Sequence, residues 1–167
     1  MHATGTDHGV AIHVRMAGAD DVGTVVAMRL ALVREYGEHA LYGRLHPRAE
    51  ERAPQLCEEQ IASSRDAFFL AESEGRVVGL LRCTESHASP LLLPERFAYV
   101  SSAYVAPAWR RRGVLRALLA RAERWCAARG LTEMRLHNVP AGVAAAAWTA
   151  LDFEPVEEVR IRQLRTP

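Results

Sequence analysis

Short stretches that are apolar, or that alternate between apolar and polar residues, recur along the whole chain, and such stretches are typical of strands. They predict strands at residues 11–16, 68–71, 77–83, 97–105 and 134–138, with two short final strands between residues 154 and 164. Ser73-Glu74-Gly75 separates the second strand from the third and predicts a hairpin turn.

Apolar residues recur at helical spacing in the segments between these strands. A first helix is expected after Asp20 or Asp21, either of which is a suitable N-cap, and Gly37 is expected to end it. A second helix is expected between residues 47 and 64, with Pro54 at its start or at a kink. The apolar face of the first helix comprises Val22, Val26, Leu30 and Val33.

The most regular helical pattern follows Gly113, and an alanine-rich helix is expected from Pro140 to Leu151. The predicted order of elements is β–α–α–β–β–β–α–β–α–β–β. This order favours a mixed sheet flanked by helices over a doubly wound parallel sheet. The central helix has one apolar stripe, which comprises Leu115, Leu118, Leu119, Ala122, Trp125 and Cys126.

Length and composition indicate one globular domain, because the 167 residues are 49% hydrophobic and can bury a full core. No apolar run approaches the length that crosses a membrane, and the amino terminus lacks the regions of a signal peptide. We therefore expect a flexible tail at residues 1–10, a single domain at residues 11–167 and a cytoplasmic protein. Cys57, Cys83 and Cys126 have neither CxxC nor metal-ligand spacing, so we expect reduced core residues and no metal site.

The stretch from Val105 to Trp125 contains a basic turn followed by the start of a helix. A strand end leads through Pro107 into a basic turn, and Gly113 precedes the central helix. Free backbone N–H groups at a helix N-terminus favour an anion, most often a phosphate. Residues 110–129 contain seven arginines and one acidic residue, Glu123, although the whole chain has a net charge of only +1. The alternative, that a chain without lysine scatters its arginines over solvated faces, remains open.

This stretch resembles the acetyl-CoA-binding motif Gln/Arg-x-x-Gly-x-Gly/Ala of the GCN5-related N-acetyltransferase (GNAT) superfamily. Arg110 takes the first place and Gly113 the fourth, whereas Leu115 departs from the family's small sixth residue. Near the end of the chain, Phe153 matches the family's closing pattern, with Trp148 in the place of its tyrosine and Asp152 in that of its glycine.

The resemblance implies an α/β fold with a mixed, mostly antiparallel sheet of about seven strands, flanked by about four helices and splayed between the fourth and fifth strands. It implies acetyl-CoA as co-substrate, with the pantetheine arm in the splay. It also allows a homodimer. The cofactor-binding residues that it implies are Ala103, Tyr104, Val105, Arg110, Arg111, Arg112, Gly113, Val114, Leu115, Arg116 and Trp148.

Acetyl transfer needs donors for the developing oxyanion and a base for the amine proton. We expect the backbone N–H groups near Tyr104 and Val105 to be the donors. No Asp or Glu occurs from Arg96 to Arg121, so the family's glutamate on the fourth strand is missing. The alternative bases are Glu35, His39 and His137; we prefer His137, at the end of the fifth strand, although each also fits an ordinary surface residue.

The family's general acid is a tyrosine, but an indole N–H has no useful acidity, so Trp148 is expected to line the pantetheine channel or to pack in the core. Glu35, Tyr36, His39 and Tyr42 are the expected acceptor-binding residues and suit a cationic amine, on a small molecule or a peptide. An ordinary polar loop explains them equally well.

The favoured function is therefore acetyl-CoA-dependent N-acetylation of a primary amine by direct attack on the thioester. The first alternative is a catalytically weak or inactive acyl-CoA-binding regulatory domain, which the missing glutamate and Trp148 favour. The second is a nucleic-acid-binding module. The net charge of +1 and the isoelectric point near 7.8 argue against it, because phosphate-backbone binding needs a broad basic face.

Overall fold

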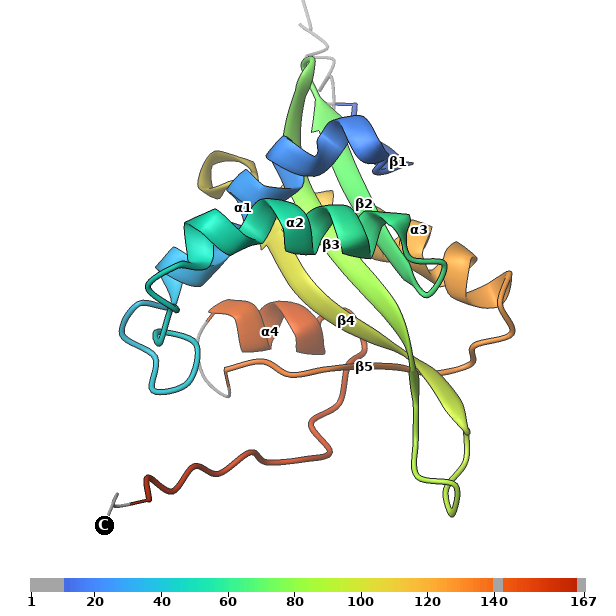
Figure 1. Ribbon diagram of the computed structural model, residues 1–167. Helices are drawn as coiled ribbons and strands as arrows, with labels where there is room; N and C mark the ends of the chain where they lie inside the picture. The colour runs from blue at the N-terminus through green and yellow to red at the C-terminus, as the bar shows by residue number, and fades with distance from the viewer. Residues whose placement is uncertain (1–10, 140–142, 165–167) are drawn as a thin grey trace, which may run out of the picture. The chain divides into compact units, whose positions relative to one another are not determined.

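One five-stranded sheet, with the strands in the order β1-β2-β3-β4-β5, organises the first part of the chain (Figure 1). Three of its four pairings are antiparallel, and β5 runs parallel to β4. The strands are β1 (His13–Met16), β2 (Asp66–Ser73), β3 (Arg76–His87), β4 (Arg96–Val105) and β5 (Met134–Leu136). A parallel pairing needs a crossover, and the helix between β4 and β5 supplies it.

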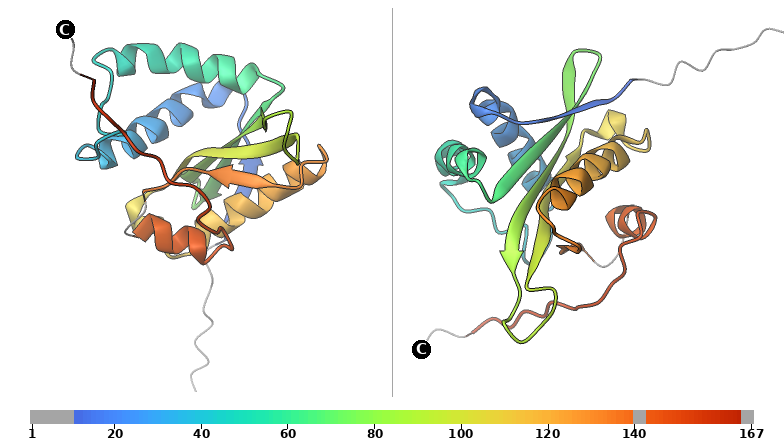
Figure 2. Two further views of the ribbon diagram at one scale, coloured as in Figure 1. Left: turned by 90° about the horizontal axis from the view of Figure 1, so that it is seen from below. Right: turned by 90° about the vertical axis from the view of Figure 1, so that its right-hand side faces the viewer.

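The computed structural model describes residues 11–139 and 143–164, which divide into two compact units between His137 and Asn138. In the first unit, α1 (Val22–Glu35) and α2 (Ala49–Ala62) cover one face of the sheet, and α3 (Val114–Ala127) covers the other (Figure 2). The second unit contains α4 (Val143–Thr149). The predicted four helices are confirmed, although the Pro140 start of the last one lies outside the described residues.

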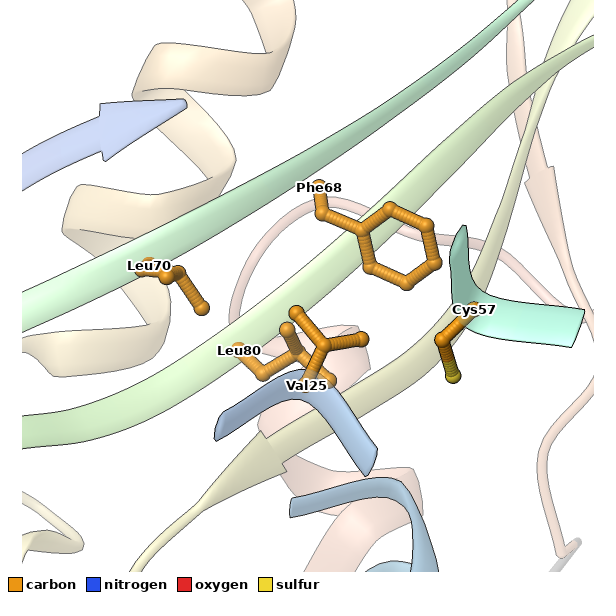
Figure 3. Packing of buried hydrophobic residues seen from close by; sticks show 5 residues of the cluster. All are labelled: Val25, Cys57, Phe68, Leu70 and Leu80. Atoms are coloured by element: carbon orange, nitrogen blue, oxygen red, sulfur yellow. The ribbon is translucent and has the colours of Figure 1, made fainter. Parts of the chain in front are cut away.

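Both faces of the sheet are apolar. On the α1–α2 face, the largest buried side chains form a cluster of Val25, Cys57, Phe68, Leu70 and Leu80 (Figure 3). On the other face, Val114 and Leu118 of α3 approach Gly79 so closely that a Cβ there would lie 2.7 Å from the Val114 side chain. The two helical layers therefore pack against β3 from opposite faces, at Leu80 and at Gly79.

The expectation of about seven strands is wrong, because the described sheet has five. The two strands predicted between residues 154 and 164 are absent, since the chain from Phe153 to Leu164 has no regular structure. Its apolar side chains are exposed, Val156 by 88% and Leu164 by 84%. A strand needs a partner for its backbone hydrogen bonds, and the alternating sequence alone does not provide one.

Other local predictions are confirmed with small shifts. Glu74 and Gly75 both have positive φ in the turn between β2 and β3. Pro54 lies inside α2 and so does not start that helix. All three cysteines are buried and free of disulfides, as expected for reduced core residues. No helix within the described ranges is long and apolar enough to span a bilayer.

Candidate active site

A β-bulge interrupts β4 just before its end. Leu80 of β3 pairs with Tyr104 and Arg82 pairs with Ser101, so Ser102 and Ala103 together lie opposite a single β3 residue. Ser102 has φ of 50°, in the left-handed region that non-glycine residues seldom adopt. Bulges and backbone strain of this kind gather next to functional sites, where they redirect the chain. The bulge immediately precedes Tyr104 and Val105, the predicted oxyanion donors.

The parallel pairing between β4 and β5 covers only part of β4. It runs from Ala98, paired with Met134, to Val100, paired with Leu136. Beyond Val100, β4 continues to Val105, and no described strand pairs with it on the β5 side. The bulge therefore lies in the part of β4 whose outer edge has no strand partner.

The basic turn presents the N-terminus of α3. After a 3-10 turn at Pro107–Trp109, Arg111 has φ of 61° and Gly113 has φ of 81°. Gly113 is the N-cap, no side chain caps the helix, and the space around the position of a Gly113 Cβ is open. Glycine adopts this left-handed conformation at little cost, which lets the chain turn directly into the helix. The first-turn N–H groups of α3 thus form an anion-binding arrangement.

The four arginines near this turn differ in their surroundings. Arg110 is held on both sides: its Nη2 donates to Glu35 Oε1 at 2.5 Å, and its Nε donates to the Val105 carbonyl at 2.9 Å. Arg112 lies over the Trp109 ring, with 5.4 Å between the guanidinium carbon and the ring centroid. Arg111, Arg112 and Arg116 are exposed around the helix start. Arg110 therefore joins the end of α1 to the end of β4, a role that the sequence did not suggest.

The predicted acceptor residues lie together in the loop that follows α1. Tyr36 and Tyr42 have ring centroids 5.7 Å apart, and the His39 ring stacks on Tyr42 at 4.9 Å. The loop is tight, because a Cβ at Gly43 would lie 2.3 Å from the Gly37 carbonyl oxygen. Burial raises the pKa of Tyr36, the Glu35 charge adds to this effect, and Arg110 opposes it. The sequence-predicted residues of this loop thus form one aromatic cluster: Tyr36, His39 and Tyr42.

His39 is poorly suited to be the base. Its Nδ1 accepts the backbone N–H groups of Leu41 at 3.2 Å and Tyr42 at 3.1 Å. The lone pair of Nδ1 is therefore occupied, and the neutral ring carries its proton on Nε2. Two of the three predicted bases are therefore already engaged. The backbone N–H groups occupy Nδ1 of His39, and the Glu35 carboxylate forms an ion pair with Arg110.

His137 has a partner that sequence reasoning missed. The Tyr99 hydroxyl lies 3.0 Å from His137 Nδ1, and the two rings meet edge to face at 5.5 Å between centroids. Burial raises the pKa of Tyr99, the neighbouring Tyr42 adds to this, and the backbone N–H of His137 opposes it. His137 itself is exposed. Strand alternation could have placed Tyr99 on one face with Ser101, but only the parallel pairing brings the end of β5 beside it.

A buried polar network connects β4 with β3 and β2. Arg82 donates to Ser101 Oγ at 3.0 Å and forms a short ion pair with Asp66. Both charged side chains are at least 86% buried, and Arg82 Nε has no hydrogen-bond partner among the described residues. Nearby, the guanidinium carbon of Arg82 lies 5.7 Å from the centre of the Phe68 ring. The carboxylate that β4 lacks is thus present two strands away, neutralised by Arg82.

Trp148 belongs to the second unit. Its ring meets Phe153 edge to face at 5.2 Å, and the Phe153 N–H donates to its carbonyl oxygen at 3.1 Å. Asp152 has φ of 64°, the conformation for which glycine is the usual residue. The chain therefore makes the turn expected after α4 in spite of its departure from the family pattern, and the role of Trp148 in a pantetheine channel stays a prediction.

Comparisons with known proteins agree with this geometry. The model of the acetyltransferase (GNAT) family matches residues 29–153. A GCN5-related N-acetyltransferase from Ralstonia eutropha JMP134 has a similar structure, with a TM-score of 0.74 and 22% identity over 92% of this chain and 99% of that one. A predicted acetyltransferase with acetyl-CoA from Clostridium acetobutylicum has a TM-score of 0.75 and 14% identity over 92% and 96%.

An aminoglycoside N-acetyltransferase, AAC(6')-Iy, in complex with the bisubstrate analogue CoA-S-monomethyl-acetylneamine is also similar. Its TM-score is 0.74, with 21% identity over 93% of this chain and 99% of that one. At these sequence identities, the similarity of these structures to this chain shows a shared fold. A search of curated protein sequences finds no match.

Proposed function

Because the chain belongs to the acetyltransferase (GNAT) family, we propose that it moves an acetyl group from acetyl-CoA to a primary amine of a small molecule. One observation carries this proposal: the bulge in β4, the turn at Gly113 and the uncapped start of α3 follow one another on a single stretch of chain. This stretch offers backbone donors for a thioester oxygen at one end and for a pyrophosphate at the other.

The turn would hold the pyrophosphate mainly through backbone. The first N–H groups of α3, from Val114 to Arg116, precede the first hydrogen bond of the helix, from Ala117 N–H to the Gly113 carbonyl, and no described side chain caps them. The helix dipole favours negative charge there, and the exposed arginines add charge-assisted contacts. Arg110 is already bonded to Glu35 and to the Val105 carbonyl, so its contribution is to fix the end of β4. Leu115 is half-buried, which leaves its N–H available in spite of its bulk.

The bulge would leave backbone N–H groups of Ala103, Tyr104 or Val105 for the thioester oxygen. Ser102 and Ala103 share one opposing residue on β3, so the regular ladder cannot use every N–H group there. Donors fixed in this way are aligned before the negative charge develops in the transition state. Thiolate departure needs no strong acid, since thiol pKa values lie near 8.5 and Trp148 has no acidic proton to give.

A cationic amine fits the acceptor side. The aromatic cluster of Tyr36, His39 and Tyr42 offers ring faces, and Glu35 adds a carboxylate at the end of α1. Ring faces attract cations, and the attraction grows when water is excluded. The similar structures include aminoglycoside N-acetyltransferases, whose substrates are polycationic amines, which supports this acceptor class. His137 would receive the amine proton.

The alternative function is acyl-CoA binding without turnover. It is favoured by the absence of an acidic residue on β4 and by Trp148 in the place of a tyrosine. Both functions predict that acetyl-CoA stabilises the protein, by mass action on the folded state. Only an acetyltransferase releases free thiol when an amine is added.

The test combines a thermal-shift titration with acetyl-CoA and a free-thiol assay over an amine panel. The panel contains an aminoglycoside, a linear polyamine and a lysine-containing peptide, each with and without enzyme. We expect a rise in melting temperature with acetyl-CoA and amine-dependent thiol release with at least one polycationic amine. Stabilisation without thiol release for any amine would favour the regulatory alternative, and neither effect would refute both.

A further inference from the structure

Tyr99 of β4 and His137, the residue after β5, are hydrogen-bond partners. His137 is exposed whereas Tyr99 is half-buried. The Tyr99 hydroxyl lies 3.0 Å from His137 Nδ1, and the charge of Tyr42 in the acceptor loop adds to the raised pKa of Tyr99. Tyr99 is therefore the more buried member of a pair whose other member is open to solvent.

The Tyr99 hydroxyl and His137 Nδ1 are hydrogen-bond partners, and the tautomer of the ring sets the direction of the bond. With the phenol as donor, the Tyr99 O–H is directed to the lone pair of Nδ1, and the neutral His137 ring carries its proton on Nε2. In that arrangement Nε2 cannot accept a proton directly from the substrate.

We propose that Tyr99 and His137 form a proton relay in which the Tyr99 oxygen takes a proton from the acceptor ammonium as its own proton passes to Nδ1 of His137. This inference rests on the acetyltransferase function proposed above. One N–H bond of the ammonium breaks and an O–H bond forms on Tyr99. The original O–H bond breaks and an Nδ1–H bond forms, which leaves a neutral amine, a neutral phenol and an imidazolium. The exposed ring then releases its proton to solvent.

Most charged groups around Tyr99 and His137 are already engaged with one another. On the face that carries Tyr99, Arg82 donates to Ser101, so a cation lies next to this part of β4. In the acceptor loop, His39 stacks on Tyr42, and the exposed Glu38 is a carboxylate with no ion pair among the described residues. Three other carboxylates on the surrounding elements are in ion pairs with arginines: Asp66 with Arg82, Glu35 with Arg110, and Glu133 with Arg135.

The pH dependence follows from the acid–base chemistry. The relay works only while His137 is neutral, so amine acetylation should fall on the acidic side of the pH–rate profile, where the ring takes up a proton. Without the relay, the reaction depends on amine that has lost its proton in solution. The loss caused by removing the relay should therefore shrink as the pH approaches the amine pKa, near 10 for an alkyl amine.

The first experiment compares Tyr99→Phe, His137→Asn and the double variant, with His87→Asn as the matched control. His87 is exposed at the end of β3. Each single relay variant should lower kcat/KM for the amine by about 10²-fold at pH 7 and leave acetyl-CoA affinity unchanged. The double variant should lose no more than the single ones, because the two groups act as one unit. Multiplicative losses, or a Tyr99→Phe loss that is constant from pH 6 to pH 9.5, would overturn the relay.

A second experiment needs no acceptor. Nitrogen-15 NMR of the histidine rings should show neutral His137 with its proton on Nε2 in the native protein, and a shift towards mixed tautomers in Tyr99→Phe. A neutral His137 that carries its proton on Nδ1 would overturn the relay even if no substrate is found. Absence of thiol release with every amine, together with the expected tautomer, would instead count against the proposed enzyme function.

Discussion

The two sides of the candidate site are built in different ways. The cofactor side comes from one continuous stretch, from the bulge at Ser102 to the first turn of α3, and its donors are largely backbone N–H groups. The acceptor side consists of side chains from distant segments, namely the aromatic cluster in the loop after α1 and the pair of Tyr99 in β4 and His137 after β5. Arg110 joins the two sides through Glu35 and the Val105 carbonyl.

This difference has consequences for substitution. A backbone-built site tolerates changes of individual side chains but not a change that blocks the backbone or alters its conformation. A site built from side chains depends on each functional group and on the packing that holds it in place. Substitutions on the two sides should therefore separate acetyl-CoA affinity from amine turnover.

The largest effect is expected at Gly113. Gly113→Glu should reduce acetyl-CoA affinity by more than about 10²-fold, because a carboxylate would stand where the pyrophosphate meets the N–H groups of α3. Isothermal titration calorimetry measures this loss.

Gly130→Glu is the matched control. Gly130 also has positive φ, 68°, and open space around its Cβ position, but it lies beyond the C-terminal end of α3. The strain of a non-glycine residue is therefore similar in both variants. Equal affinities in the two variants would show that Gly113 is not part of an anion site.

On the acceptor side, His137→Ala should lower kcat/KM for amine acetylation by about 10²–10⁴-fold, with acetyl-CoA affinity nearly unchanged. The physical reason is the loss of the group that receives the amine proton. A pH–rate profile from pH 5 to pH 9 provides the measurement. If the variant keeps the acidic limb of the native profile, another group is the base, and Glu35 is the next candidate.

The arginines should show smaller and different effects. Arg116→Ala should weaken acetyl-CoA binding by about five- to thirty-fold, as for one charge-assisted hydrogen bond, and leave kcat unchanged. Arg110→Ala should instead lower kcat as well, since it frees Glu35 and the end of β4. Calorimetry and steady-state kinetics on both variants test this contrast, which fails if the two behave alike.

The smallest effect is expected at Trp148. Trp148→Phe should leave turnover within a few-fold, because the indole has no proton of useful acidity. Trp148→Tyr restores a phenol and should raise turnover if the position faces the thioester sulfur. Steady-state kinetics with acetyl-CoA measures both. A large loss of rate in Trp148→Phe, with fold and acetyl-CoA affinity retained, would mean that the indole N–H stabilises the transition state.

The sequence by itself predicted the parts that depend on neighbours in the chain. The apolar periods of β4 and α3, and Gly113 between them, were sufficient to predict a strand, a turn and a helix N-terminus. Backbone geometry of this kind is set by residues within a few positions of one another. The aromatic cluster was also foreseen as a group, because Tyr36, His39 and Tyr42 lie within one loop.

The tertiary structure alone decided the rest. The partner of His137 is Tyr99, 38 residues away, and the partner of Arg110 is Glu35, 75 residues away. Such contacts follow from strand register and helix packing, which a single sequence does not specify. The same reason explains the error at residues 154–164, whose alternation predicted strands. An alternating segment becomes a strand only where the edge of a sheet is available for its backbone to pair with. The local sequence does not determine whether such an edge is available.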